Sequence, residues 1–400
     1  MVKIALLGFG VVGSGTAEVL TENKEIIKRK VGCDFELKYI LDLRSFPESP
    51  FADLIVHDIN IILNDPEISI VAEMMGGAHP AYDFTKAALE AGKSVVTSNK
   101  EVVSTFGVEL CAIAAQHGVR YLFEASVGGG IPIIRPLMND LASNKVNSIS
   151  GIINGTTNYI LTAMRDNGAT FADALACAQK LGYAEADPSA DVDGIDAARK
   201  TAILAALASG KLIDPKTIHT EGITKITLEE TEFASNIGYA VKLIGHAEVN
   251  DAGITALVSP RMVSLSNPLS RIDDAFNGVL VNANMVGDVM FYGPGAGKLP
   301  TASAVVADII DIIENRDAKT KAIEWTAATE DDVIDFDTYA CRRMFIFKSG
   351  ASLPDDSPAG KTYTHGELSA LITDSCVSEL DAGNIACAFG SALCSVYRIL

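Results

Sequence analysis

The N-terminal part of the chain alternates between short apolar runs and longer segments of mixed character. Residues 3–7 form an apolar run, and apolar residues then recur at helical spacing from Ala17 to about Lys30. A short apolar run fits a buried strand, and a period of about 3.6 residues fits an amphipathic helix. The alternation continues with strand-like segments at 35–41, 68–77, 94–100 and 119–130 and a helix at 81–91. Strands that take turns with helices predict an α/β fold with a Rossmann-like, doubly wound parallel sheet.

Beyond this predicted sheet the pattern changes. Residues 151–164 begin like a strand, pass through a polar turn and continue as a helix. A loop is predicted at 187–188, followed by an alanine-rich helix over 194–209 with Asp193 as its N-cap. Because residues 201–208 carry no charge, we expect this helix to be buried.

The last quarter of the chain contains two further patterns. A second glycine cluster leads into a helix over 292–310, which fits a dinucleotide contact and a structural loop equally well. The C-terminal segments are a strand-like stretch at 339–348, a loop with Pro354 and Pro358, a helix-like stretch at 367–380 and an apolar stretch at 384–400.

Composition and charge exclude some classes of partner. The chain is 48% hydrophobic, with 32 basic and 51 acidic residues and a formal charge of −19. Nucleic acids and anionic membranes need a basic surface, so we expect neither as a partner. No apolar stretch approaches the roughly 18 residues of a membrane span, and no signal peptide is expected before the first strand. The seven cysteines contain no Cys-x-x-Cys pair, which argues against a zinc site and favours a reducing, cytoplasmic setting.

The apolar run 3–7 leads directly into a glycine-rich turn, with the sequence Gly8-Phe9-Gly10-Val11-Val12-Gly13. In a strand–turn–helix context Gly8 permits the tight turn, Gly10 lets the backbone approach a pyrophosphate, and Gly13 allows close packing of helix on strand. The phosphates would bind to the free N–H groups of the helix N-terminus. The pattern alone also fits a purely structural turn, although its flanks favour a nicotinamide dinucleotide.

Asp42 and Arg44 follow the second predicted strand. An acidic residue at this place typically binds the ribose 2′-OH of NAD, whereas an arginine accommodates the 2′-phosphate of NADP. Both are present, so the sequence predicts NAD(P) binding without deciding between the two.

Two further features follow predicted strands, where ligands gather in such sheets. Lys100 directly follows the strand-like residues SVVTSN (94–99), and by spacing alone it also fits an exposed loop lysine. Glu124 precedes the glycines 128–130, where a carboxylate and exposed carbonyl groups could hold a hard cation. A flexible connector is the simpler interpretation of the second feature.

Asp196 and Lys200 are four residues apart on the predicted buried helix and therefore share one face. A surface ion pair is the ordinary interpretation of that spacing. Charged groups at the start of a buried helix, however, require partners or a function, and a lysine can exchange a proton with an alcohol or carbonyl oxygen. Glu185 is expected in the loop before this helix.

Taken together, these segments resemble homoserine dehydrogenases. The resemblance rests on the segments GFGVVGSG (8–15), TSNKEVV (97–103), FEASVGGGIPIIRPL (123–137), GIINGTTNYIL (151–161), GYAEADPSADVDGIDAARK (182–200) and GPGAGKLPTASAVVAD (293–308). It covers roughly residues 1–315, and the segment that ends in DAARK is its most specific part.

The resemblance implies NAD(P)-dependent interconversion of L-homoserine and L-aspartate 4-semialdehyde, a step toward threonine and methionine. It implies that Lys200 is the catalytic acid/base, assisted by Asp196. Glu185, Asp196 and Lys100 would bind the substrate, with Glu185 suited to its ammonium group. It further implies that Lys100 lies near the nicotinamide.

The resemblance also extends the expected cofactor site and suggests a cation. Gly182 and Gly297 would join the glycine loop among the cofactor-binding residues. The positions of a family site for a monovalent cation such as sodium are Glu124, Val127, Gly129 and Ile131. Backbone carbonyls would act at the last three of these, so their residue types can vary.

The implied organisation has three parts. Residues 1–135 form an NAD(P)-binding Rossmann domain that is completed by about 295–325, and 136–294 form an α+β catalytic domain that builds a homodimer. Longer members end in an ACT domain that senses threonine, but residues 330–400 lack the full ACT pattern. This small region is expected to be a divergent ACT-like domain or an element that packs on the catalytic core.

Two alternatives to this enzyme remain at this stage. A cofactor-binding sensor that has lost catalysis should show damage to the lysine–carboxylate set, yet Glu185, Asp196, Lys200 and Lys100 are all present. Another NAD(P)-dependent oxidoreductase acting on a different amino-acid aldehyde fits the fold and the glycine loop as well.

Overall fold

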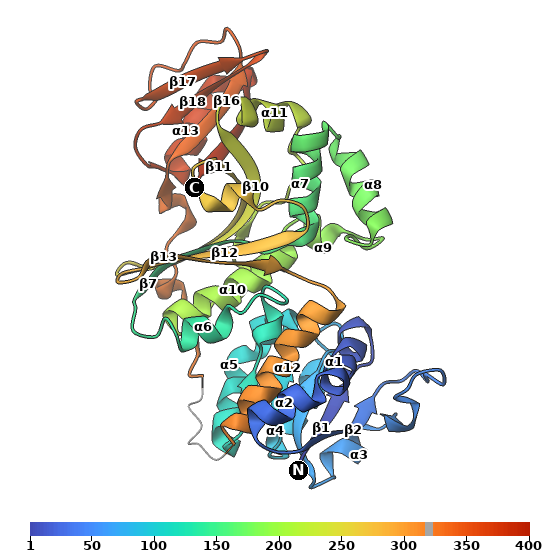
Figure 1. The fold of residues 1–400 in the computed structure, drawn as a ribbon. Helices are drawn as coiled ribbons and strands as arrows, with labels where there is room; N and C mark the ends of the chain where they lie inside the picture. Colours follow the sequence, from blue (N-terminus) through green and yellow to red (C-terminus); the bar gives the residue numbers. More distant parts are fainter. Residues whose placement is uncertain (317–322) are drawn as a thin grey trace. The chain divides into compact units, whose positions relative to one another are not determined.

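The computed structural model describes residues 1–316 and 323–400. The chain forms two compact units (Figure 1). The first consists of Met1–Asn144, Ala202–Pro215 and Phe291–Ala327, and the second of Lys145–Thr201, Lys216–Met290 and Ala328–Leu400. The domain boundaries predicted above stay predictions, and each unit is described by itself.

The first unit is built on a six-stranded sheet in which every described strand pair is parallel. The order is β3-β2-β1-β4-β5-β6, and this arrangement confirms the predicted doubly wound sheet. Residues 4–7 of the first strand are fully buried, as expected for a strand covered on both faces. The strands are β1 (Val2–Leu7), β2 (Phe35–Leu41), β3 (Ile55–Val56), β4 (Ile68–Glu73), β5 (Ser94–Thr97) and β6 (Tyr121–Leu122).

Helices cover both faces of this sheet (Figure 1). The helices of this unit around the sheet are α1 (Val11–Glu22), α2 (Lys24–Val31), α3 (Ile59–Leu63), α4 (Ala81–Glu90), α5 (Lys100–His117) and α12 (Lys298–Glu314). The short helix α6 (Ile134–Met138) also belongs to this unit. Apolar residues of α12 join α1 and α2 in one core, so the helix after the second glycine cluster belongs to this unit. A side chain at Gly15 would lie 2.8 Å from the carbonyl oxygen of Lys298, which requires glycine where α1 meets α12.

The second unit contains a large mixed sheet of order β13-β12-β7-β10-β11-β20-β16-β18-β17, with β9 paired to β11. Its strands are β7 (Val146–Ile152), β9 (His219–Thr220), β10 (Tyr239–Asn250), β11 (Gly253–Ser264), β12 (Phe276–Ala283), β13 (Gly287–Pro294), β16 (Arg343–Lys348), β17 (Gly360–His365), β18 (Leu368–Thr373) and β20 (Leu393–Ile399). Strands β10 and β11 form a regular antiparallel pair along their whole length. Strand β20 pairs with β11, so the C-terminal strands extend the same sheet.

The helices of the second unit are α7 (Gly155–Asn167), α8 (Phe171–Leu181), α9 (Ser189–Val192), α11 (Leu228–Asn236) and α13 (Glu379–Phe389). The helix α10 (Ile195–Ser209) begins in the second unit, and its residues from Ala202 onward belong to the first. Residues 202–206 of α10 are buried, as their lack of charge indicated. The prediction of Asp193 as N-cap was wrong. The helix α10 begins at Ile195, and its first hydrogen bond runs from the backbone N–H of Ala198 to the carbonyl of Gly194, so Gly194 is the N-cap. Gly194 has a φ of +84°, which favours glycine at this turn.

The C-terminal region corrects another prediction. Residues 367–380 are not one helix: they contain β18 and β19 (Val377–Ser378), and α13 starts only at Glu379, after the capping residue Ser378. All six residues of β18 are buried between β16 and β17, and a short, mostly apolar segment of that length does not distinguish strand from helix. In the helices of the described residues, no segment is long and apolar enough to cross a membrane.

Candidate active site

The glycine loop connects β1 to α1 in the first unit. Gly8 has a φ of +93°, and a side chain at Gly13 would lie 2.0 Å from the carbonyl oxygen of Gly8, so neither position accepts another residue without strain. A side chain at Gly10, in contrast, would meet no atom within 4 Å. Among the described residues, Gly10 therefore faces open space, and as the N-cap of α1 it has no side chain that could bond to the N–H groups of the first turn. This arrangement leaves the helix N-terminus available for a phosphate group.

Asp42 holds this loop in place from the end of β2. The backbone N–H of Phe9 donates to the Asp42 carboxylate at 2.8 Å. Arg44 donates to the same carboxylate through its backbone N–H at 2.9 Å and through its guanidinium at 3.0 Å. The hydrogen bond from the Arg44 side chain is the main reason why the pKa of Asp42 falls to about 2. The two residues predicted to distinguish NAD from NADP thus form one ion pair, with Arg44 as its exposed member.

Lys100 is the first residue of α5, directly after β5. The side chain of Asn99 accepts hydrogen bonds from Glu101 and Val102, which caps α5, and donates to the carbonyl of Gly77 at 2.8 Å. Parallel strands β1, β4 and β5 end at the same edge of the sheet. Lys100 and the glycine loop consequently lie along that edge, where ligands of such folds bind.

Glu124 and the glycines after it form a tightly packed turn. The buried Glu124 carboxylate accepts the backbone N–H groups of Ile133, Ile134 and Arg135 at 2.6, 2.8 and 2.7 Å. Gly129 has a φ of +55°, and a side chain there would lie 2.4 Å from the carbonyl oxygen of Gly295. The glycines 128–130 therefore contact the backbone of the second glycine cluster at Gly295, close to Gly297 at the start of α12.

In the second unit, α10 and α7 bring together a buried set of polar side chains. The Lys200 ammonium donates to Asp196 Oδ2 at 2.7 Å and to the carbonyl oxygen of Ile153 at 2.8 Å. Asn154, the N-cap of α7, donates to the same Asp196 oxygen at 2.9 Å and to Asp191 at 2.7 Å. Lys200, Asp196 and Asn154 are each less than 10% exposed. An ammonium has three N–H donors, and two of them bond to groups in the described part of the chain, so one is left there for a reacting oxygen.

Gly182 and Glu185 belong to the segment between α8 and α9. Gly182 ends α8 with a φ of +78°, and the backbone carbonyl of Glu185 accepts a hydrogen bond from Gln179 at 3.1 Å. The Glu185 side chain is exposed, in contrast to Asp196 and Lys200.

Comparisons with known proteins identify the family of this chain. Residues 132–310 match the family model "Homoserine dehydrogenase", and residues 8–124 match "Homoserine dehydrogenase, NAD binding domain". The chain belongs to the homoserine dehydrogenase family. Homoserine dehydrogenases are NAD(P)-dependent oxidoreductases of amino-acid biosynthesis, so this chain is an enzyme of that class.

Individual relatives agree with this assignment. The homoserine dehydrogenase of Synechocystis is 44% identical over 323 residues, which are 78% of this chain and 73% of that protein. The crystal structure of a homoserine dehydrogenase from Thiobacillus denitrificans matches this chain with a TM-score of 0.90 and 32% sequence identity. The match covers 100% of this chain and 98% of that protein. A hyperthermophilic archaeal homoserine dehydrogenase in complex with NADPH matches with a TM-score of 0.68 and 28% sequence identity, over 80% of this chain and 99% of that protein.

Asn154 and Asp191 belong to the polar set around Lys200, although the sequence patterns did not indicate them. Asn154 precedes a predicted helix, which is the signature of an N-cap, but that signature does not show that its amide N–H groups bind two carboxylates. Asp191 was one of several acidic residues around the loop, with no spacing that set it apart.

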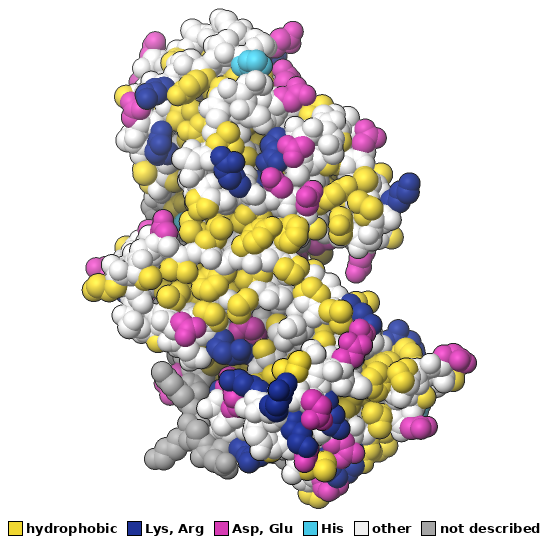
Figure 2. Space-filling view, in the orientation of Figure 1, with side chains coloured by type: hydrophobic (Ala, Val, Ile, Leu, Met, Phe, Trp, Pro, Cys, Tyr) yellow, Lys and Arg dark blue, Asp and Glu magenta, His cyan; other side chains and the backbone are white. Residues whose placement is uncertain are grey.

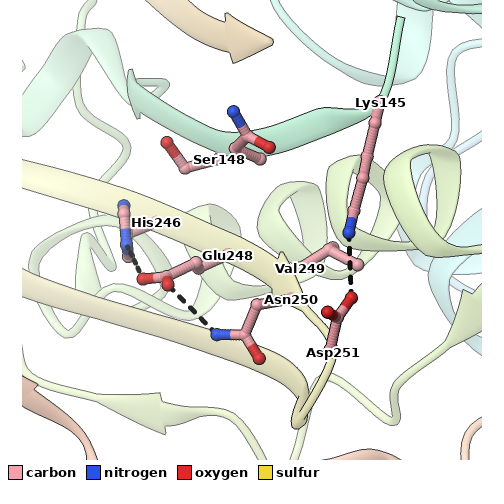
Figure 3. A pocket seen from close by; sticks show the side chains of 8 residues that line it. Lys145, Ser148, His246, Glu248, Val249, Asn250 and Asp251 are labelled. Atoms are coloured by element: carbon pink, nitrogen blue, oxygen red, sulfur yellow. Dashed lines mark hydrogen bonds and ion pairs between the residues drawn. The ribbon is translucent and has the colours of Figure 1, made fainter. Parts of the chain in front are cut away.

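A polar cavity of about 280 Å³ lies elsewhere in the second unit of this homoserine dehydrogenase and includes none of the predicted site residues. Figure 3 shows two of its lining residues, His246 and Glu248, on one strand, and the ion pair between two others, Lys145 and Asp251. Burial is the main cause that lowers the pKa of His246 to about 4, and Ser150 is bonded to its Nδ1 at 2.8 Å. This histidine is therefore neutral at physiological pH.

Proposed function

We propose that Lys200 is the acid/base in the interconversion of L-homoserine and L-aspartate 4-semialdehyde, a step toward threonine and methionine. The main support for this role is the environment of the Lys200 ammonium. It is buried, and in the described part of the chain it donates to Asp196 and to the carbonyl of Ile153, so one N–H remains. In the reductive direction a reduced nicotinamide, when bound, would supply the hydride that adds to the aldehyde carbon. Lys200 gives a proton to the carbonyl oxygen as it becomes a hydroxyl, and in the oxidative direction the neutral amine takes that proton back.

Asp196 and Asn154 support this exchange. The Asp196 carboxylate accepts hydrogen bonds from both Lys200 and Asn154, so it holds the ammonium in one place and balances its charge inside the protein. We assign Asp196 and Glu185 to substrate binding, with Glu185 toward the substrate ammonium. Lys100 is assigned to the substrate or the nicotinamide, because it starts α5 at the sheet edge beside the glycine loop.

Replacement of Lys200 by methionine tests this function. We expect Lys200→Met to lower kcat for L-homoserine oxidation by about a hundredfold to ten-thousandfold, because general acid–base catalysis contributes in this range. Binding of NADPH, followed by its fluorescence, should be unchanged. Lys180→Met, on the exposed side of α8, is the matched control and should keep wild-type activity. Turnover by Lys200→Met at the wild-type rate would contradict the assignment.

The proposed cofactor residues are Gly8, Phe9, Gly10, Val11, Val12, Gly13, Asp42, Arg44, Lys100, Gly182 and Gly297. The observations in their support are the uncapped N-terminus of α1 and the open space at Gly10.

We further propose that a monovalent cation such as sodium binds at Glu124 and the carbonyls of Val127, Gly129 and Ile131. Three backbone N–H groups already occupy the Glu124 carboxylate, which has about four lone-pair positions, so one position is left for a cation. No group of three or more metal-binding side chains occurs within residues 1–316 and 323–400, which suits a cation bound mainly by carbonyls. Activity that is equal in sodium and tetramethylammonium chloride would contradict this site.

We also propose that the enzyme works in the cytoplasm as a homodimer built through the second unit. Apolar side chains gather on the visible surface near β12 and β13 (Figure 2). Met285, between these two strands, and Met290 on β13 are exposed. Exposed apolar patches of this kind mark interaction surfaces. Light scattering should give twice the mass of the chain, and a monomer at micromolar concentration would refute the dimer.

A further inference from the structure

The last strand of the chain carries a buried arginine that bridges two carboxylates. Arg398 on β20 is 5% exposed. Its Nε and Nη2 donate to the two oxygens of Glu379 on α13 at 2.7 and 3.0 Å. Its Nη1 donates to Glu221 at 2.7 Å. Glu379 belongs to the C-terminal region, whereas Glu221 precedes α11 in the middle of the chain, so Arg398 connects two distant segments of the second unit.

Glu221 is fixed from several sides. His219 also bonds to its carboxylate, at 2.6 Å, and the backbone N–H of Glu221 donates to the carbonyl of Val258 on β11 at 2.8 Å. Strand β9, which ends at Thr220, runs parallel to β11. The segment 219–223 is thus held between the central sheet and the C-terminal arginine.

The other side of this segment packs against the turn that starts α10. The backbone N–H of Ile223 donates to the carbonyl oxygen of Val192 at 2.8 Å. A side chain at Gly222 would lie 2.2 Å from the same oxygen, and one at Gly194 would lie 2.9 Å from a methyl carbon of Thr220. The two backbones are therefore in direct contact, and a shift of one would displace the other.

That turn leads into the helix of Lys200. Asp191, just before the turn, and Asp196, just after it, are both bonded to Asn154, and Asp196 holds the Lys200 ammonium. A continuous path of contacts consequently runs from Arg398 through Glu221 and Val192 to the proposed acid/base.

We propose that Arg398 and Glu221 are positioning residues for the reaction, through which the C-terminal region holds the start of α10 and hence Lys200 in its working place. The proposal rests on the acid/base role of Lys200. The matched family models end at residue 310, so the arginine comes from a part of the chain outside them. Whatever displaces β20 would also change the rate of the reaction.

A matched pair of arginine variants tests this path. Arg398→Met removes the bond to Glu221. Arg343→Met is the control, because Arg343 is also buried, lies opposite Arg398 on β16 and pairs with Glu379 at 2.7 Å. Of these two arginines, only Arg398 bonds to Glu221 in the described contacts.

We expect Arg398→Met to lower kcat by about tenfold to a hundredfold, because misplacement of a catalytic group by about 1 Å can cost that much. The KM for the cofactor should not change. Hydrogen exchange should become faster in residues 189–196 and 219–224. Arg343→Met should lose thermal stability while its kcat and its exchange in both segments stay at wild-type values. Arg398→Lys, which can still reach Glu221, should recover most of kcat.

Several results would overturn the proposal. One is an equal fall of kcat in both arginine variants, which indicates a general structural role. Another is wild-type kcat and exchange in Arg398→Met. If Arg398→Met does not fold, Glu221→Gln gives the same test, because it keeps the size of the side chain and removes its charge. Failure of the acid/base assignment is recognised separately, by turnover in Lys200→Met, and leaves the exchange measurement valid.

Discussion

Glu73 provides a test of the energetics of the first unit. It stands at the carboxyl end of β4 and is fully buried. One carboxyl oxygen accepts the backbone N–H of Met75 at 2.6 Å, and the other accepts the hydroxyl of Thr97 at 2.6 Å. Burial raises the pKa of Glu73 from 4.5 to about 7, although these hydrogen bonds oppose the rise. Glu73 therefore binds a proton more strongly in the folded protein than in the unfolded chain.

The sign of the pH effect follows from this difference. Between pH 4.5 and about 7 the folded state keeps a proton that the unfolded state has released, so stability falls as the pH rises. The contribution of Glu73 to the free energy of unfolding is fully present below pH 4.5 and is lost above about pH 7. The gap between the two pKa values corresponds to about 3 kcal/mol. Glu73→Gln has no proton to release, so its stability relative to the wild type should improve by about this amount across the interval.

The single tryptophan of the chain makes the measurement specific. Trp325 belongs to the first unit and packs against Phe123 at 5.2 Å between ring centroids. Urea unfolding followed by its fluorescence, from pH 5 to 8.5, reports on the unit that contains Glu73. Glu90→Gln, on the exposed side of α4, is the control and should track the wild type at every pH. A stability difference between Glu73→Gln and wild type that does not vary with pH would refute the reasoning.

Substitutions at two further residues test the candidate site. Asn154→Ala removes the hydrogen bonds to Asp191 and Asp196 and should lower kcat about tenfold, with about 1 kcal/mol lost from the cap of α7. Asn154→Ser, which keeps a capping oxygen, should show the fall in kcat with less loss of stability by thermal unfolding, and unaltered kcat in both variants would contradict the role of the amide. Arg44→Ala should raise the KM for NADP about tenfold relative to that for NAD, because hydrogen bonds to charged groups contribute about 1.5–3 kcal/mol. The measurement is the ratio of the KM for NADP to the KM for NAD, and an unchanged ratio would show that Arg44 does not bind the 2′-phosphate.

The parts of the fold that the sequence predicted well are those set by local pattern. The buried run of β1, the glycine loop and the helix after it follow from residues that are neighbours in the chain. The pairing of Asp196 with Lys200 follows from helical spacing in the same way. Residues 367–380 were assigned wrongly, because their apolar pattern is the same for a central strand and a buried helix. Their neighbours β16 and β17 decided the outcome, and periodicity carries no information about strand neighbours.

The contacts around α10 show a second limit. Asp191 and Asp196 become partners of Asn154 only because β7 delivers Asn154 to the start of α7, beside the start of α10. Arg398 and Glu221 are 177 residues apart, and each is an ordinary charged residue in its own segment. Two strand pairings bring Arg398 and Glu221 together. Strand β20 pairs with β11 in a register that places Arg398 opposite Arg261, and β9, just before Glu221, also pairs with β11. A long-range ion pair of this kind depends on strand register, and a single residue of slip would turn Arg398 to the other face of the sheet. It follows that insertions or deletions in β20 should affect the reaction rate even where they leave every proposed site residue in place.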